Sequence, residues 1–198
     1  MKVVVVGATG TIARPVVRAP QPRHEVVAAS RSSGVRVDIR EKPSLEKLFQ
    51  TVKDIDAVVC CAGSGAWKPL EDLTDADFDR SLRYKLMGPV NLARLTARHL
   101  RDGGSSTLTS GVLSREPVKN GAAISLVNAG LEGFAVGASI ELPRGLRINV
   151  VSPPWIAETL SEMKMDPKAG VPAEDAARAY VAAVEGKMTG QVLDARKF

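Results

Sequence analysis

The feature that most restricts the fold is an apolar run that leads into a glycine-rich loop near the start of the sequence. Val3–Val6 is a continuous β-branched stretch, which is typical of a strand buried on both faces of a sheet. Gly7-Ala8-Thr9-Gly10-Thr11-Ile12-Ala13 follows at once, and Ile12–Arg18 has helical character. The first glycine permits a tight strand-to-helix turn, the second lets a ligand approach the backbone, and the final alanine lets helix and sheet pack closely. The segment therefore predicts the first strand–turn–helix unit of an α/β fold.

The rest of the chain alternates short apolar runs with segments of helical periodicity. Strands are expected at Val3–Val6, Glu25–Ala29, Val35–Ile39, Ala57–Cys61, Ser106–Thr109, Leu146–Val151 and Gln191–Leu193. Helices are expected at Ile12–Arg18, Leu45–Val52, Asp75–His99 with a break near Gly88-Pro89, Ala122–Leu142 and Glu174–Val184, with Pro20 and Pro22 ending the first helix early. Such alternation implies parallel strands and right-handed crossovers. The sequence predicts an α/β fold with a doubly wound parallel sheet of the Rossmann type, in a single domain over residues 1–198.

Composition and charge exclude several classes of protein. The chain is 44% hydrophobic and 25% charged, which fits an ordinary globular domain. No apolar run approaches the roughly 20 residues of a membrane span, and the first is too short for a signal peptide, so no membrane partner is expected. The net charge is +5, but the basic residues are scattered. The best cluster, Arg94, Arg98 and Arg101, is interpreted as a solvated helix face, so nucleic acid is not an expected partner.

The two cysteines are neighbours, Cys60 and Cys61. Adjacent strand residues point to opposite faces of a sheet, so this pair suits neither a disulfide nor a metal site. We expect no metal and a cytoplasmic location.

The glycine loop also predicts a site for a nucleotide, because free backbone N–H groups at the start of a helix attract phosphate. The expected contacts are Gly7, Thr9, Gly10, Thr11 and Ile12. The alternative is a glycine turn that only lets the strand and helix pack.

The end of the second strand favours NADP(H) over NAD(H). An NAD site usually carries an acidic residue there, whereas this chain has Ser30-Arg31-Ser32-Ser33. Arg31 could bind a 2′-phosphate, with Ser30 and Ser32 as further donors. The alternative is a surface arginine in a loop.

Along nearly its whole length the chain resembles the short-chain dehydrogenase/reductase family. Val37-Asp38-Ile39 resembles the Asp-Val step that holds the adenine, Cys61-Ala62-Gly63 the Asn-Ala-Gly turn after the fourth strand, and Arg147–Pro153 the strand that leads to the Pro-Gly turn over the nicotinamide. Gly7–Ala13, Gly88–Leu92, Gly130–Phe134 and Thr189–Leu193 resemble other family motifs. The resemblance implies further cofactor contacts from Asp38, Ile39, Cys61, Ala62, Gly63, Asn128, Pro153 and Ile156.

The family's catalytic residues are Asn, Ser, Tyr and Lys, and this chain departs from all of them. Matched by their neighbours, these places hold Lys85, Gly111 with Ser110 just before it, Ile124 and Asn128. The pattern resembles a small subgroup of about the length of this chain, 198 residues, that lacks the usual active site.

Three residues remain as catalytic candidates. Ser110 could hold a carbonyl oxygen if its side chain points inward, and Asn128 could bond a ribose hydroxyl. Lys85 could act as a general acid if burial lowers its pKa, unless it faces solvent or pairs with an acidic residue. Trp155, after the proline turn, could cover the nicotinamide, or it could, like Trp67, only anchor a loop.

Two functions stay open at this point. The first is an NADP(H)-dependent oxidoreductase of unknown carbonyl or alcohol substrate, with a nonstandard active site. The second is a non-catalytic NADP(H)-binding sensor or partner-binding module. The resemblance also implies a homodimer or homotetramer, formed through the helices expected near Asp79–His99 and Ala122–Leu142.

Overall fold

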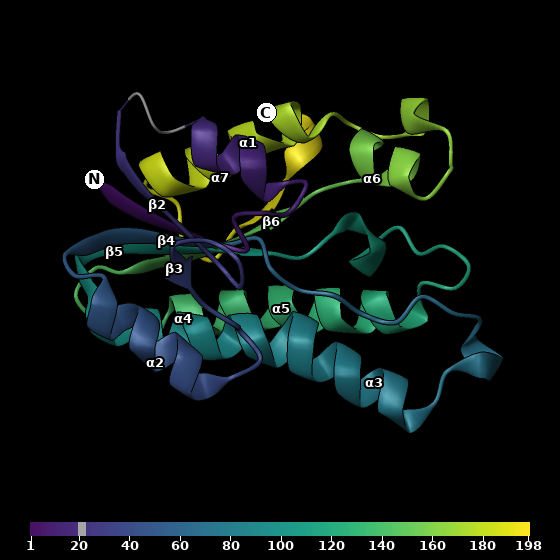
Figure 1. The fold of residues 1–198 in the computed structure, drawn as a ribbon, viewed down its shortest axis with the longest axis horizontal. Helices are drawn as coiled ribbons and strands as arrows, with labels where there is room; N and C mark the ends of the chain where they lie inside the picture. Colours follow the sequence, from purple (N-terminus) through teal and green to yellow (C-terminus); the bar gives the residue numbers. More distant parts are fainter. Residues whose placement is uncertain (20–22) are drawn as a thin grey trace.

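A seven-stranded parallel sheet forms the centre of the molecule in the computed structural model, which describes residues 1–19 and 23–198 (Figure 1). The strands are β1 (Lys2–Val6), β2 (Glu25–Ser30), β3 (Val35–Arg36), β4 (Ile55–Cys60), β5 (Leu100–Thr109), β6 (Arg147–Ser152) and β7 (Val192–Asp194). Their order across the sheet is β3-β2-β1-β4-β5-β6-β7, and every neighbouring pair is parallel. The predicted doubly wound sheet is therefore confirmed.

Helices cover both faces of the sheet (Figure 1). On one face lie α1 (Ala13–Arg18), α6 (Ala157–Glu162) and α7 (Ala173–Glu185), and on the other α2 (Lys42–Thr51), α3 (Asp75–Ser81), α4 (Gly88–His99) and α5 (Ala122–Ser139). Short 3-10 turns occupy Leu70–Asp72, Val112–Ser114, Pro167–Ala169 and Ala195–Lys197. Helix α6 was not predicted. Helix α1 ends at Arg18, and Pro20 and Pro22 lie outside the described residues.

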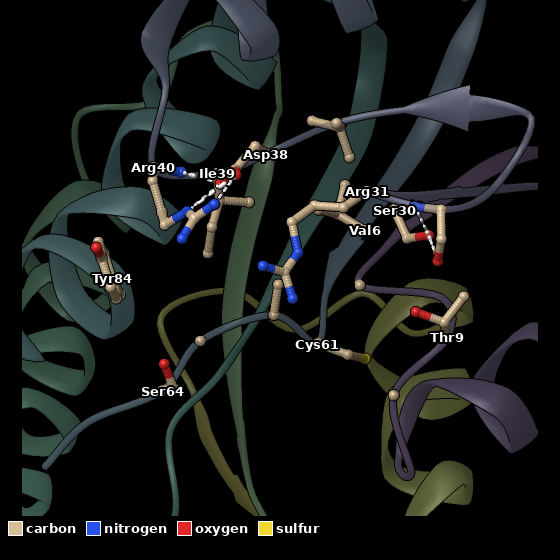
Figure 2. A pocket seen from close by; sticks show the side chains of 16 residues that line it. Val6, Thr9, Ser30, Arg31, Asp38, Ile39, Arg40, Cys61, Ser64 and Tyr84 are labelled. Carbon is tan, nitrogen blue, oxygen red and sulfur yellow. Dashed lines mark hydrogen bonds and ion pairs between the residues drawn. The ribbon is translucent and has the colours of Figure 1, made fainter.

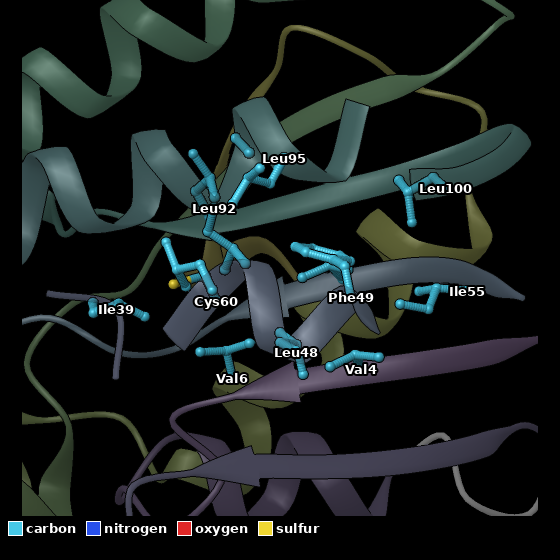
Figure 3. Close-up of a cluster of buried hydrophobic side chains, with 14 of the residues drawn as sticks. Val4, Val6, Ile39, Leu48, Phe49, Ile55, Cys60, Leu92, Leu95 and Leu100 are labelled. Atoms are coloured by element: carbon cyan, nitrogen blue, oxygen red, sulfur yellow. The ribbon is translucent and has the colours of Figure 1, made fainter. Parts of the chain in front are cut away.

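Strand β1 separates two apolar layers. Val4 and Val6 point into the core beneath α2, α4 and α5 (Figure 3). Val3 and Val5 point into the core beneath α1 and α7. All four are almost fully buried, and burial of one such side chain contributes about 1.5–3 kcal/mol. The continuous apolar run in the sequence thus reflects a central strand that is covered on both faces.

The two cysteines fall in opposite cores, as predicted. Cys60 belongs to the core beneath α2, α4 and α5, and Cys61 packs against the core beneath α1 and α7. Both thiols are free, and burial raises the pKa of Cys60 to about 11.

The long helical stretch is interrupted close to the predicted place, Gly88-Pro89. Residues Leu82–Met87 form a π-helical turn, and Gly88 and Pro89 begin α4 instead of interrupting a helix. Proline is well placed in a first helical turn because its missing N–H has no partner there. Gly88 also packs tightly on Ile39, since a Cβ on it would lie 3.0 Å from Cδ1 of that residue.

Helix α3 begins with a capping box that should make stability depend on pH. Asp77 accepts a hydrogen bond from Lys68 Nζ at 2.8 Å, and Thr74 completes the box, so the pKa of Asp77 falls to about 2. The folded pKa lies below the unfolded value of about 3.9, so this stabilisation is present above pH 4 and is lost as the pH falls toward 2. We expect Asp77→Asn to lower the melting temperature at pH 7, and the difference from wild type to shrink below pH 4. Thermal unfolding with Asp79→Asn as the charge control checks this, and a difference that does not change with pH would contradict it.

Helix α5 has an inner face in the core and an outer apolar face. Val127, Leu131 and Ala135 are buried, whereas Leu126 and Val136 are about half exposed. By length and composition alone, α5 is the helix of the described residues that could cross a membrane, with a mean hydropathy of 1.2 and 28% of its residues buried. The helix carries Asn128 and Glu132, so it is not an uninterrupted apolar run of the kind that the sequence analysis looked for. A homodimer or homotetramer through α4 and α5 stays a prediction.

Candidate functional site

A cavity of about 630 Å³ opens at the carboxyl ends of β1, β2 and β4 (Figure 2). Strand order reverses between β1 and β4, which is where open α/β sheets bind their ligands. The cavity is lined by Val6, Gly7, Thr9, Gly10, Ser30, Arg31, Ser32, Val37, Asp38, Ile39, Arg40, Cys61, Ala62, Gly63, Ser64 and Tyr84. Most of the predicted cofactor contacts thus meet in one place, although they come from distant parts of the chain.

The glycine loop forms the turn at the end of β1. Gly7 has a φ of +86°, and a Cβ on it would lie 2.8 Å from the backbone nitrogen of Ala62. The N–H of Gly10 donates to the carbonyl of Gly7 at 2.9 Å, which closes the turn. Gly7, Thr9 and Gly10 line the cavity, whereas Thr11 and Ile12 do not, and Ile12 packs against the core beneath α1 and α7.

The loop after β2 presents Arg31 to the cavity (Figure 2). The hydroxyl oxygen of Ser30 accepts the N–H groups of Ser32 at 3.1 Å and Ser33 at 2.9 Å, which fixes the turn on either side of Arg31. Within the described residues Arg31 forms no ion pair. Ser30 therefore shapes the loop, and the guanidinium of Arg31 remains available to a ligand.

A second arginine lines the cavity but is already paired. Arg40 Nε donates to both carboxylate oxygens of Asp38, at 2.7 and 2.9 Å, and this bond lowers the pKa of Asp38. The Arg40 guanidinium lies 5.3 Å from the ring centroid of Tyr84, a cation–π contact. Arg40, Tyr84 and Ser64 were not predicted. Arg40 lies two residues after a predicted contact, but no sequence pattern points to Tyr84.

Lys85 comes from the π-helical turn and lies behind the cavity. Its Cα would lie 3.3 Å from a Cβ on Gly63, and its Nζ donates to the carbonyl of Ser110 at 3.4 Å. Burial lowers the pKa of Lys85. Among the residues that the structure describes, no carboxylate pairs with it, so the interpretation as a lysine paired with an acid is not supported.

Ser110 does not point into the cavity. Its Oγ donates to Glu132 Oε1 at 2.8 Å, and the side chain is buried. The condition for holding a substrate oxygen is therefore not met in this structure. The carboxylate of Glu132 also accepts from Ser114 at 2.9 Å and from Arg115 at 2.7 Å, so it ties the end of β5 to helix α5.

Asn128 and Ile124 occupy the places of the family's lysine and tyrosine on α5. Asn128 Nδ2 donates to the carbonyl of Gly111 at 3.2 Å, and its buried Oδ1 has no partner among the described residues. Cδ1 of Ile124 would lie 2.6 Å from a Cβ on Gly65, so the isoleucine side chain fills the space beside that loop. Asn128 does not line the cavity.

The turn after β6 lies beside the end of β5. The carbonyl of Pro153 accepts from Val112 N at 3.0 Å, and Ile156 is buried in a bridge with Val171. Neither Pro153 nor Ile156 lines the cavity. In residues 1–19 and 23–198, no group of three or more His, Cys, Asp or Glu is arranged to hold a metal ion.

Comparisons with known proteins agree with this architecture. The family model described as enoyl-(acyl carrier protein) reductase matches residues 8–187. A hydroxynaphthalene reductase-like protein of Metarhizium brunneum is 30% identical over 146 residues, which cover 68% of this chain and 55% of that protein. The chain therefore spans about half the length of the curated relatives it matches.

Two solved structures are similar over almost the whole chain. The protein lin1944 from Listeria innocua is 36% identical with a TM-score of 0.94, and the match covers 98% of each chain. A small-chain dehydrogenase in complex with NADPH is 30% identical with a TM-score of 0.86, and the match covers 98% of this chain and 95% of that one.

Proposed function

The chain belongs to the short-chain dehydrogenase/reductase family, and on that premise we propose that it is an NADP(H)-dependent oxidoreductase. It acts on a small carbonyl or alcohol substrate, in an active site without the family's usual tyrosine and lysine. The observation that carries the proposal is Arg31, which a fixed turn presents to the cavity and which forms no ion pair within the described residues.

The residues of the cavity fit a dinucleotide. A side chain on Gly7 would collide with Ala62, so the tight turn at the end of β1 requires glycine, and this turn is where a dinucleotide fold binds the diphosphate. Arg31 matches a 2′-phosphate, and Asp38 and Ile39 lie where the adenine would be held. When bound, the cofactor supplies a hydride. A dehydrogenase with 30% identity to this chain binds NADPH, which supports the same choice here.

Titration calorimetry with NADPH and NADH tests the cofactor. We expect NADPH to bind about 100-fold more tightly, because the extra phosphate meets an arginine. Equal affinity would refute the choice of NADP(H), and no heat for either nucleotide would refute the dinucleotide site itself. Absorbance measurements with a panel of quinones, aldehydes and ketones then test turnover.

Lys85 is the proposed source of the reaction's proton. Its pKa is lowered by burial, so the protonated acid is lost as the pH rises through a value below the usual 10.4 or so of a lysine. Its amine donates a hydrogen bond to the carbonyl of Ser110, and Lys85 does not line the cavity. We therefore expect its contribution to the rate to lie at or below the low end of the 10²–10⁴-fold range that is usual for a general acid. Lys85→Ala should lower kcat about tenfold and remove the fall in rate at high pH. Steady-state kinetics against pH, with the exposed Lys119→Ala as control, checks this, and an unchanged profile would exclude Lys85.

A non-catalytic NADP(H)-binding module is the second candidate. It is favoured by Ile124 and Asn128 at the places of the tyrosine and lysine, and by the engagement of Ser110 with Glu132. Tight binding of NADPH without turnover of any substrate in the panel would select this alternative.

We also propose a cytoplasmic location. The two cysteines are free thiols, which suits a reducing compartment.

A further inference from the structure

The loop that follows β4 leads from the cavity to an aromatic side chain. Ser64 lines the cavity, and the next residue, Gly65, lies against Ile124 of helix α5. Trp67 comes two residues later, and its Cζ3 lies 3.5 Å from the position of a Cβ on Gly121. Ile124, at the place of the family's tyrosine, therefore contacts this loop at a point between the residue that lines the cavity and Trp67.

Trp67 meets Trp155, which follows the Pro153-Pro154 turn at the end of β6. The ring centroids are 5.4 Å apart and the ring planes make an angle of 82°, an edge-to-face contact. Trp67 remains 37% exposed, and the backbone N–H of Lys68 donates to the carbonyl of Asn120 at 3.2 Å, which holds the loop in place. An exposed indole on a fixed loop is suited to stack against a planar aromatic ligand.

The proton chemistry of the site points to the same kind of ligand. Ile124 has no proton to give, and the hydroxyl of Thr109 donates to the carbonyl of Cys60 at 2.7 Å. Lys85 remains, but its amine points to the carbonyl of Ser110. An acceptor that becomes a stable anion when it receives a hydride needs the least help from an acid. Phenols have a pKa of about 10, whereas water, which resembles an ordinary alcohol, has a pKa of about 16.

We propose that Trp67 and Trp155 bind the substrate and that this substrate is a planar quinone. The inference rests on the proposed function, because the electrons come from the reduced nicotinamide. One oxygen of the quinone would gain the hydride from C4 of the reduced nicotinamide as an O–H bond, and the other oxygen would be left as a phenolate that takes one proton to give the hydroquinone. The C4–H bond that breaks would leave the nicotinamide oxidised. The phenolate takes its proton from Lys85 or, in the Lys85→Ala variant, from water after the hydride has moved, so the loss of the lysine should cost only about tenfold in kcat.

Intrinsic fluorescence reports on this site directly, because Trp67 and Trp155 are the only two tryptophans in the chain. We expect 1,4-naphthoquinone to quench the emission of the whole protein in a saturable way, without any cofactor present. Cyclohexanone, which is neither planar nor aromatic, should have no effect. Quenching that rises linearly with quinone, and is no stronger than in the urea-unfolded chain, would overturn the proposal.

Variants of the first tryptophan separate binding from folding. Trp67→Ala should raise the KM for 1,4-naphthoquinone about tenfold and leave kcat unchanged, because one stacking face is lost. Trp67→Phe should restore most of the affinity. Leu70→Ala is the matched control, since Leu70 follows Trp67 by three residues in the chain and is 71% exposed. A Trp67→Ala enzyme with a wild-type KM would refute the role of the pair.

Calorimetry with NADPH distinguishes a failure of the proposed oxidoreductase function from a failure of the quinone inference. If NADPH does not bind, the proposed function fails, whatever the fluorescence shows. If NADPH binds but 1,4-naphthoquinone neither quenches nor is reduced, the quinone inference alone is overturned.

Discussion

Arg31→Ala should weaken the binding of NADPH about 100-fold and leave the binding of NADH unchanged. A hydrogen bond to a charged group contributes about 1.5–3 kcal/mol, and a guanidinium that binds a phosphate in a bidentate manner lies at the upper end of that range. Within the described residues Arg31 forms no ion pair that a phosphate would have to break, and its charge only helps, at longer range, to lower the pKa of Asp38. Titration calorimetry of both nucleotides measures the difference.

Two further variants make this result specific. Arg31→Lys keeps the charge but loses the planar fork, so it should recover only part of the affinity. Arg40→Ala should affect NADPH and NADH alike, because Arg40 is bound to Asp38 and stands beside Tyr84 on the wall of the cavity. If Arg31→Ala lowered the affinity for NADH as much as the affinity for NADPH, Arg31 would contribute to the binding of both nucleotides and would not select the 2′-phosphate.

The position of Arg31 at the cavity could be predicted because it depends on local sequence. An arginine directly after a strand, with no acidic residue beside it, favours NADP(H) over NAD(H) whatever the rest of the chain does. The glycine turn is local in the same sense, and so is the continuous apolar run of β1. These features were sufficient to predict the sheet and most residues of the cavity.

Other parts of the site depend on contacts between distant residues. The π-helical turn at Leu82–Met87 brings Tyr84 to the cavity and Lys85 to the carbonyl of Ser110, yet the residues of this turn have ordinary helical character. The direction of the Ser110 side chain is set by Glu132, which lies 22 residues further along the chain. Neither arrangement follows from the spacing of residues, because each is decided by tertiary packing.

Gly7→Ala is expected to destabilise the protein by about 3 kcal/mol and to abolish the binding of NADPH. A left-handed backbone costs a residue with a Cβ about 1–2 kcal/mol, and Gly7 has a φ of +86°. The new Cβ would also lie 2.8 Å from the backbone nitrogen of Ala62, and a clash with backbone cannot be relieved by a change of rotamer, so about 1–3 kcal/mol is added. Urea unfolding measures the loss of stability, and calorimetry at a temperature where the variant is folded measures binding.

Two other glycines show whether the effect belongs to this turn. Gly133→Ala lies in α5 with nothing within 4 Å of the new Cβ, so it should be neutral or stabilise the protein by about 0.5–1 kcal/mol. Gly10→Ala places a Cβ 3.3 Å from the carbonyl of Gly7, a tight contact without a left-handed backbone, so it should weaken NADPH while costing less stability than Gly7→Ala. A Gly7→Ala protein as stable as wild type would show that the turn can adopt another conformation. In that case the binding of the diphosphate would not require a glycine at the turn that follows β1.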